Sequence, residues 1–181
     1  EQFTFGNGEV WSMDSVKNAA LQQQAAAGAV TIDGFYRLDN VFYGNAANNI
    51  LNGLEWNDTF KTSLGNDTFN GGDGVDTADY SGAAAGVKVN LSTSSQTLGG
   101  VAVAAGKALD GQGSTDILNS IGNVTGSAFG DYIYGRAYAN TLIGGAGNDR
   151  LEGQNEGGLL GGGAGNWGLI GGNAGGTITY G

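Results

Sequence analysis

The sequence contains no cysteine, no histidine and no proline. Without histidine, neither a Ser-His-Asp triad nor a His-Glu-x-x-His zinc site can form. Without cysteine there is no thiol catalysis, no thiolate metal site and no disulfide. The lack of proline beside 37 glycines argues against a linker or a disordered low-complexity segment, which is usually rich in both. We therefore expect a folded protein that is not an enzyme.

Basic residues are also scarce, because 7 Lys and Arg stand against 17 Asp and Glu and leave a formal net charge of −10. An acidic surface repels phosphate backbones and anionic lipid, so nucleic acid is not an expected partner, whereas cations are. No apolar run is long enough for a membrane-spanning helix, so membrane insertion is not expected. The chain starts at Glu1 without a charged-then-apolar leader, so we expect any signal segment to be absent or removed.

What the sequence does contain is a nine-residue unit, complete from Gly144 to Glu152. Glycines occupy places 1, 2 and 4 of this unit, an aspartate occupies place 6 and a large apolar residue occupies place 8. Place 8 falls on Phe42, Leu51, Phe60, Phe69 and Ala78, then on Val124, Ile133, Leu142, Leu151, Leu160, Leu169 and Ile178. Self-similarity at a fixed period predicts stacked repeats that bury a continuous core.

Place 6 carries the polar residues of the unit. It reads Asn40, Asn49, Asp58, Asp67 and Asp76 in the first block, and Gly122, Asp131, Asn140, Asp149, Gly158, Trp167 and Gly176 in the second. The apolar period survives to the end of the chain, whereas the acid is lost after Asp149. We therefore expect the core to continue to the end of the chain, whereas the polar residues of place 6 do not.

This pattern resembles the repeats-in-toxin (RTX, haemolysin-type) calcium-binding family. The resemblance implies an all-β fold, a right-handed parallel β-roll in which six residues form a turn and three a short strand. Two units would make one coil, so residues 18 apart would stack. It also implies Ca²⁺ as the cofactor, and a protein secreted by type I secretion or held at the bacterial cell surface.

Given that stacking, glycine-rich turns can aim several carbonyls at one point, and Ca²⁺ takes roughly 6–8 oxygen ligands. Asp58 with Asp76, and Asp131 with Asp149, would supply two carboxylates each and are the strongest pairs. The candidate metal ligands are Asp58, Asp76, Asp67, Asn49, Asp73, Asp131, Asp149 and Asn140. Aspartate and asparagine are also common in turns because they hydrogen-bond to their own backbone. For Asp33, Asp39, Asp79, Asp110 and Asp116 we expect such a capping role or a solvated side chain.

Two segments fall outside the repeat. Residues 1–34 are expected to form a cap, with a hairpin followed by a helix from Met13 to Ala27 whose Val16 and Ala20 face the core. Residues 80–116 break the phase between a first block at 35–79 and a second at 117–181, whose last coils lack calcium aspartates. This insert should hold one or two strands, and it either bulges out of one roll or separates two.

The predicted function is a calcium-binding secreted module that folds on binding Ca²⁺. One alternative is a self-assembling surface-layer, filament or adhesin protein, whose coils stack end to end or edge to edge. Another is an accessory or polysaccharide-binding module of a secreted enzyme or toxin, in which aromatic residues would stack on sugar. The candidates for such stacking are Trp56, Trp167, Tyr132, Tyr134 and Tyr138. Residues 163–168 match Gly-x-Gly-x-x-Gly, but no helix pattern follows, so dinucleotide binding is not expected.

Overall fold

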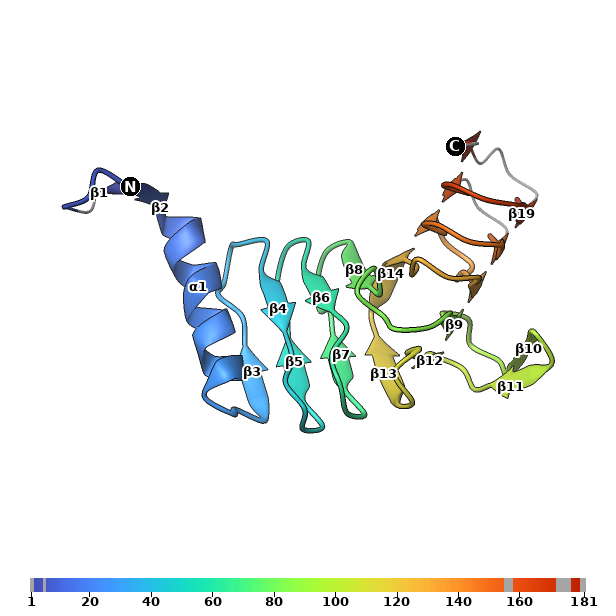
Figure 1. The fold of residues 1–181 in the computed structure, drawn as a ribbon, viewed down its shortest axis with the longest axis horizontal. Helices are drawn as coiled ribbons and strands as arrows, with labels where there is room; N and C mark the ends of the chain where they lie inside the picture. The colour runs from blue at the N-terminus through green and yellow to red at the C-terminus, as the bar shows by residue number, and fades with distance from the viewer. Residues whose placement is uncertain (1, 5, 155–157, 172–176, 180–181) are drawn as a thin grey trace.

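The computed structural model describes residues 2–4, 6–154, 158–171 and 177–179. In this part of the chain the fold is all-β with one helix, and two largely parallel sheets form a β-roll (Figure 1). The expected parallel β-roll is therefore confirmed. One sheet has nine described strands, in the order β3, β5, β7, β13, β12, β9, β15, β17 and β19. The other has seven, in the order β4, β6, β8, β14, β16, β18 and β20.

The strands are short because each repeat assigns only its last places to a strand. The nine-stranded sheet contains β3 (Thr31–Asp33), β5 (Ile50–Asn52), β7 (Thr68–Asn70), β13 (Thr115–Asn119), β12 (Lys107–Leu109), β9 (Lys88–Asn90), β15 (Tyr132–Tyr134), β17 (Asp149–Glu152) and β19 (Trp167–Ile170). The seven-stranded sheet contains β4 (Val41–Tyr43), β6 (Thr59–Lys61), β8 (Asp76–Asp79), β14 (Ile121–Thr125), β16 (Thr141–Ile143), β18 (Leu159–Gly161) and β20 (Thr177–Thr179).

The stacking interval of 18 residues is confirmed by the strand register. Phe42 pairs with Phe60 between β4 and β6, and Leu51 pairs with Phe69 between β5 and β7. The place-8 side chains from Phe42 to Leu160 are all buried between the sheets, and Leu169 and Ile178 pack against them partly buried. The repeated apolar residue therefore forms the core of the roll.

The insert leaves the roll continuous. In the seven-stranded sheet β8 lies directly beside β14, with Ala78 paired with Val124, so the two blocks form one roll. The insert also adds strands to the other sheet, where β12 is antiparallel to both β9 and β13. A hairpin of β10 (Gln96–Leu98) and β11 (Val101–Val103) projects beyond that sheet (Figure 1). The segment thus has more strands than the sequence predicts.

The N-terminal cap is a hairpin of β1 (Gln2–Thr4) and β2 (Val10–Ser12) followed by α1 (Met13–Ala26). The hydroxyl of Ser12 accepts a hydrogen bond from the Ser15 N–H at 3.1 Å and caps the helix. The buried residues of α1 are Leu21 and Ala25, one turn apart, whereas Val16 and Ala20 are only half-buried. Leu21 and Ala25 therefore form the centre of the face that α1 buries, and the expected residues Val16 and Ala20 lie at its margin.

The helix closes the roll at the end where β3 and β4 lie (Figure 1). The side chain of Asn18 accepts the N–H of Val41 at 2.8 Å, which ties α1 to β4. Among the described residues, no helix is long and apolar enough to span a membrane.

Candidate metal centre

The turns between strands lie in two rows along the roll. The first turn row leads from the nine-stranded sheet to the seven-stranded sheet and includes residues 53–57 and 71–75. The second turn row leads back and includes residues 62–67 and 144–148. Place 6 ends each turn: in the first row it is Asn40, Asp58, Asp76 and Asn140, and in the second Asn49, Asp67, Asp131 and Asp149. These eight side chains are no more than 4 % exposed.

Place-6 residues of successive coils are linked by hydrogen bonds. The N–H of Asn40 donates to Oδ1 of Asp58 at 2.7 Å, and the N–H of Asp58 donates to Oδ1 of Asp76 at 2.8 Å. In the second row the N–H of Asp131 donates to Oδ1 of Asp149 at 3.0 Å. One carboxylate oxygen of each acid is thus used to hold neighbouring coils together.

The second oxygen is left without a partner in three of the acids. Oδ2 of Asp58, Asp76 and Asp149 is buried and has no hydrogen-bond partner among the described residues. Each lies where a Cβ on the place-1 glycine of its unit would stand. A Cβ on Gly53 would lie 2.2 Å from Oδ2 of Asp58 and 2.5 Å from the carbonyl oxygen of Gly71. Glycine at this place leaves room for oxygen atoms that converge without a donor, as the oxygen shell of a hard cation requires.

The same cradle recurs around the other two acids. A Cβ on Gly71 would lie 2.3 Å from Oδ2 of Asp76, and a Cβ on Gly144 would lie 2.4 Å from Oδ2 of Asp149. A second oxygen adjoins the latter, since the carbonyl of Gly162 would be 2.8 Å from that Cβ. Places 2 and 4 hold positive φ, at 96° and 137° for Gly72 and Gly74, so turn residues there favour glycine.

The electrostatics of these carboxylates follow from their burial. Burial raises the pKa of Asp58 to about 6, although hydrogen bonds from Asn40 lower it and the charge of Asp76 raises it further. Burial likewise raises the pKa of Asp149 to about 6, against the hydrogen bond from the Asp131 N–H. Burial is also the main cause of the raised pKa of Asp76. Ionising these acids inside the protein is costly unless a positive charge compensates them.

Two other acids of the second row already have donors. Oδ2 of Asp67 accepts the hydroxyl of Ser63 at 2.6 Å. Oδ2 of Asp131 accepts the N–H of Ser127 at 2.6 Å, and its Oδ1 accepts the Ser127 hydroxyl at 2.8 Å. Burial still raises the pKa of both carboxyl groups. These acids are therefore less in need of a cation than Asp58, Asp76 and Asp149.

Where place 6 is an asparagine, its side chain brings an amide nitrogen, Nδ2, into the turn in place of a carboxylate oxygen. Nδ2 of Asn40 donates to the carbonyls of Leu38 and Phe35 at 3.0 and 3.2 Å, to the Gly53 carbonyl at 3.3 Å and to Oδ1 of Asp58 at 2.9 Å. Its amide group lies among four oxygens, as a bound cation would.

The other two asparagines behave similarly. Nδ2 of Asn140 donates to the carbonyls of Arg136 and Tyr138 at 2.9 and 2.5 Å, and Nδ2 of Asn49 donates to the carbonyl of Ala29 at 3.0 Å. In these turns the side-chain N–H groups satisfy carbonyl oxygens that a metal ion could otherwise bind.

One acid in the row was not expected from the sequence. Asp116 is fully buried at the end of the insert, and its Oδ1 accepts the N–H of Asp67 at 3.0 Å, as a place-6 acid does. Its Oδ2 accepts the hydroxyl of Tyr80 at 3.1 Å, and burial raises its pKa to about 7. The expected solvated or capping role was wrong because the insert shifts the phase. Its Asp-x-Leu spacing with Leu118 was the available signal.

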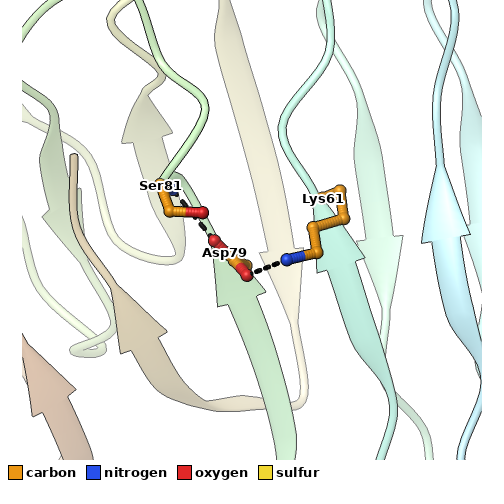
Figure 2. Close-up of polar contacts among 3 residues, drawn as sticks. All are labelled: Lys61, Asp79 and Ser81. Atoms are coloured by element: carbon orange, nitrogen blue, oxygen red, sulfur yellow. Dashed lines mark hydrogen bonds and ion pairs between the residues drawn. The ribbon is translucent and has the colours of Figure 1, made fainter. Parts of the chain in front are cut away.

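Two further acids lie apart from these cradles. Asp73 is exposed in its turn, with its N–H donating to the carbonyl of Leu54 at 3.0 Å. Asp79 forms an ion pair with Lys61 of the neighbouring strand and accepts the N–H of Ser81 at 2.9 Å (Figure 2). Burial alone would raise the pKa of Asp79, but the bonds from Lys61 and Ser81 leave it lowered. Asp79 is therefore a carboxylate that the protein itself has neutralised.

The aromatic candidates for sugar stacking lie in separate parts of the roll. Trp56 and Tyr138 are 53 % and 69 % exposed in the first turn row. Tyr132 belongs to β15, where its ring lies against Gly99 of the insert hairpin. Trp167 begins β19, and its Nε1 donates to the carbonyl of Gly163 at 2.9 Å. Tyr134 lies on β15 with Tyr132.

No group of three acidic side chains converges anywhere in the described ranges. A cation in these turns would therefore depend on one or two carboxylates and on main-chain carbonyls. The unpartnered oxygens, the glycine cradles and the oxygen-only donor set fit Ca²⁺ at Asp58, Asp76 and Asp149.

Comparison with known proteins gives one family. The model of the RTX calcium-binding nonapeptide repeat matches residues 39–55, 43–78 and 125–156. The matched segments contain all the candidate ligand residues. A search of curated proteins finds no significant match.

Proposed function

We propose that this chain, which carries RTX calcium-binding nonapeptide repeats folded as a β-roll, is a calcium-binding module that folds on binding Ca²⁺ outside the cell. In this proposal the module has no catalytic role and acts as part of a secreted or cell-surface protein. Ca²⁺ is its cofactor and its principal partner.

The observation that carries the proposal is that three place-6 aspartates, Asp58, Asp76 and Asp149, each have a buried Oδ2 without a donor. A buried charge that lacks a partner destabilises a fold, whereas a divalent cation bound only by the folded state stabilises it. The roll without metal also places Asp58 beside Asp76, and their like charges repel. Calcium would remove both penalties at once.

The contacts also support an order among the proposed ligands. Asp58 with Asp76, and Asp149 with Asp131, come first because at least one oxygen of each pair has no donor. Asp67 comes next, since Ser63 already donates to it. Asn49 and Asn140 come last, because their amide nitrogens point to carbonyl oxygens, and only their Oδ1 atoms could act as ligands.

Asp73 is the remaining proposed ligand. It lies exposed in the same turn as Gly72, and it could reach a cation only from the solvent side. We place it with the weak ligands, and the variant Asp73→Asn should lower calcium affinity much less than a change at Asp76.

The test is far-UV circular dichroism of the purified chain in calcium and in chelator. We expect a β-sheet spectrum in calcium and a largely unfolded spectrum in chelator, with recovery when calcium is added back. Magnesium at the same concentration serves as the control, because it demands a smaller octahedral shell. Equal sheet content with chelator and with calcium would contradict the proposal.

The extracellular setting, which the repeat family supports, predicts a weak affinity for calcium. Extracellular calcium modules bind at about 10⁻⁴–10⁻³ M, so a roll of this kind would stay unfolded where calcium is scarce. A calcium titration of the spectrum should therefore have its midpoint in that range. A midpoint below about 10⁻⁶ M, where cytosolic sensors work, would contradict an extracellular role.

A second candidate function is self-assembly. Helix α1 covers the roll at β3 and β4, whereas β19 and β20 are the outermost described strands at the other end of their sheets. Outermost strands carry main-chain groups that can pair with another chain. Sedimentation velocity with calcium distinguishes the two functions: growth into long assemblies supports this one, and a persistent monomer supports the folding module.

A further inference from the structure

The first turn row is interrupted at one coil. Strand β13 ends at Asn119 and β14 begins at Ile121, so Ser120 alone, at φ 58°, makes the corner between the sheets. In the neighbouring coils residues 71–75 and 135–140 make this connection as full turns. A hollow of about 710 Å³ lies here, lined by Val75 on one side and Tyr138 on the other. The missing turn thus leaves a notch in the edge of the roll.

The guanidinium of Arg136 lies in this notch. Its Nη2 is 2.4 Å from the position that a Cβ on Gly122 would take, so it fills the space left by that glycine. In the described part of the chain its buried Nε has no hydrogen-bond partner, and no carboxylate forms an ion pair with it. Asp76 is the acid whose charge it influences. A planar fork with unsatisfied donors is suited to bind a carboxylate in a bidentate manner.

A second hollow adjoins the first. It measures about 230 Å³ and shares Arg136 and Tyr138 with the larger one, and its wall includes Ser92, Ser120 and Gln154. Together the two hollows form a groove with the arginine at the point they share. Their combined size lies in the range of small-molecule sites in proteins.

The remaining wall of the groove is mixed. The larger hollow is lined by the polar residues Asn123, Thr141 and Thr177 and by the apolar residues Val75, Ala139 and Leu159. Tyr138 is 69 % exposed, which leaves most of its ring free to cover one face of a ligand. Hydroxyl and amide groups beside an aromatic ring suit the alternating polar edge and apolar face of a sugar.

We propose that this groove, which we call the Arg136 groove, binds an acidic sugar. The carboxylate of the sugar pairs with the Arg136 guanidinium, its hydroxyls bond to the amide and hydroxyl groups of the wall, and its ring lies against Tyr138. A single arginine matches the single carboxylate of one sugar residue. The ligand is a uronate, either free or as one residue of a polysaccharide. The groove adjoins the first turn row, because Asn140 lines the larger hollow and Arg136 fills the space at Gly122, which is also a place-6 position.

Isothermal titration of the calcium-loaded chain tests this site with four probes: D-glucuronate, a galacturonate trisaccharide, D-glucose and acetate. We expect saturable binding of at least one uronate probe, at least about tenfold tighter than glucose or acetate, as charge-assisted hydrogen bonds provide. Binding of the trisaccharide alone identifies a polysaccharide as the source, and binding of the monomer shows that a free sugar acid suffices.

Two variants separate recognition from structure. Arg136→Lys keeps the positive charge near Asp76 and should leave the fold intact, yet it loses the fork and should weaken uronate binding by about tenfold. Arg150→Gln removes an exposed arginine that pairs with Glu152 outside the groove, and it should bind as the unchanged chain does. Circular dichroism verifies the fold of each variant. No saturable uronate binding, or equal binding by the Arg136→Lys variant, overturns the proposal.

Discussion

At the scale of single residues, the side chain at place 6 determines whether a turn contains a free carboxylate oxygen or amide N–H donors. An aspartate there leaves one buried oxygen without a donor, as in Asp58 and Asp76. An asparagine there donates its side-chain N–H groups to main-chain carbonyl oxygens of the turns, as Asn40 does. The first kind of turn gains from a cation, and the second is satisfied without one. The roll therefore contains both turns that need calcium and turns that do not.

The first prediction concerns Asp76→Asn. The change removes one carboxylate of the strongest pair, so the chain should bind fewer calcium ions in a titration. Losing one site lowers the free energy of unfolding by about 2.7 kcal/mol when calcium stands at 100 times the Kd of that site. In chelator the variant should be no less stable, because repulsion with Asp58 is relieved. Asp14→Asn, in the first turn of α1, is the matched control and should leave the calcium count unchanged.

The second prediction concerns Asn40→Asp. The new carboxylate would face the carbonyls of Phe35, Leu38 and Gly53, which now accept from Nδ2. In chelator the variant should lose about 1–3 kcal/mol of stability, because buried acceptors are left unpaired. Calcium should restore that loss and raise the number of bound ions. Equal stability of the variant and the unchanged chain in chelator would contradict this role of Asn40.

Much of this residue pattern can be predicted from the sequence. The apolar period identified the buried place-8 residues from Phe42 to Leu160, because residues at a strict nine-residue period all take the same position in the coil. The role of Asp116 was predicted wrongly because the insert interrupts the nine-residue repeat. Asp116 lies beside Asp67 because of the strand register and the hydrogen bond between them, which the spacing in the sequence does not reveal. The donors to Asp67 and Asp131 come from serines at place 2, where the repeat pattern has glycine. Such local substitutions change a site without changing the period.

At the scale of elements, the strands are held by stacked side chains in the core. The rings of Phe42 and Phe60 are parallel within 4°, with centroids 4.9 Å apart, and Phe69 stacks on Phe60 at 5.2 Å. Strands of three residues have few hydrogen bonds each, so this aromatic column stabilises the first block through burial. Removing large apolar side chains from water is the main source of stability in such a narrow core.

The third prediction follows from this column. Phe60→Ala should lower the free energy of unfolding in calcium by about 3–5 kcal/mol, because a large buried side chain leaves a cavity. Phe129→Ala is the control, since Phe129 is 47 % exposed in a turn, and it should change stability by less than about 1 kcal/mol. Chemical denaturation at fixed calcium measures both. A loss at Phe60 no larger than at Phe129 would show that the column is not what holds the block.

The sequence predicted some elements better than others. Helix α1 was predictable because Ser12 caps it and Gly28, at φ 85°, follows its end. Its packing face was not, because Leu21 and Ala25 are recognisable only once the end of the roll is in place. In the insert, β12 lacks a repeat signal, and it forms because β9 and β13 offer it antiparallel partners on both sides. Elements that depend on distant partners carry little local signal.

At the scale of the whole molecule, calcium and protons compete for the same carboxylates. The pKa values of Asp58 and Asp149 are raised to about 6, and that of Asp116 to about 7, chiefly by burial. A carboxyl group with a raised pKa holds its proton more tightly in the folded state than in the unfolded state. Its protonation therefore stabilises the calcium-free fold, and that stabilisation is lost as the pH rises through about 6 to 7.

The fourth prediction is a pH dependence of opposite sign with and without calcium. In chelator, where the chain is largely unfolded near pH 8, the folded fraction should grow as the pH falls to about 5, because the buried acids take up protons. In calcium the gain should vanish or reverse over the same range, since protons then displace the ion. Circular dichroism at each pH gives the folded fraction in chelator, and thermal unfolding gives the stability in calcium. A folded fraction in chelator that is largest at pH 8 would contradict the assignment of these buried acids.

The most direct measurement is an anomalous difference map from a crystal grown in ample calcium. We predict peaks beside Oδ2 of Asp76 and Oδ2 of Asp149, each bounded by the carbonyls of two stacked turns, and no peak at the amide of Asn40. Well-ordered turns without a peak beside either aspartate would contradict this prediction.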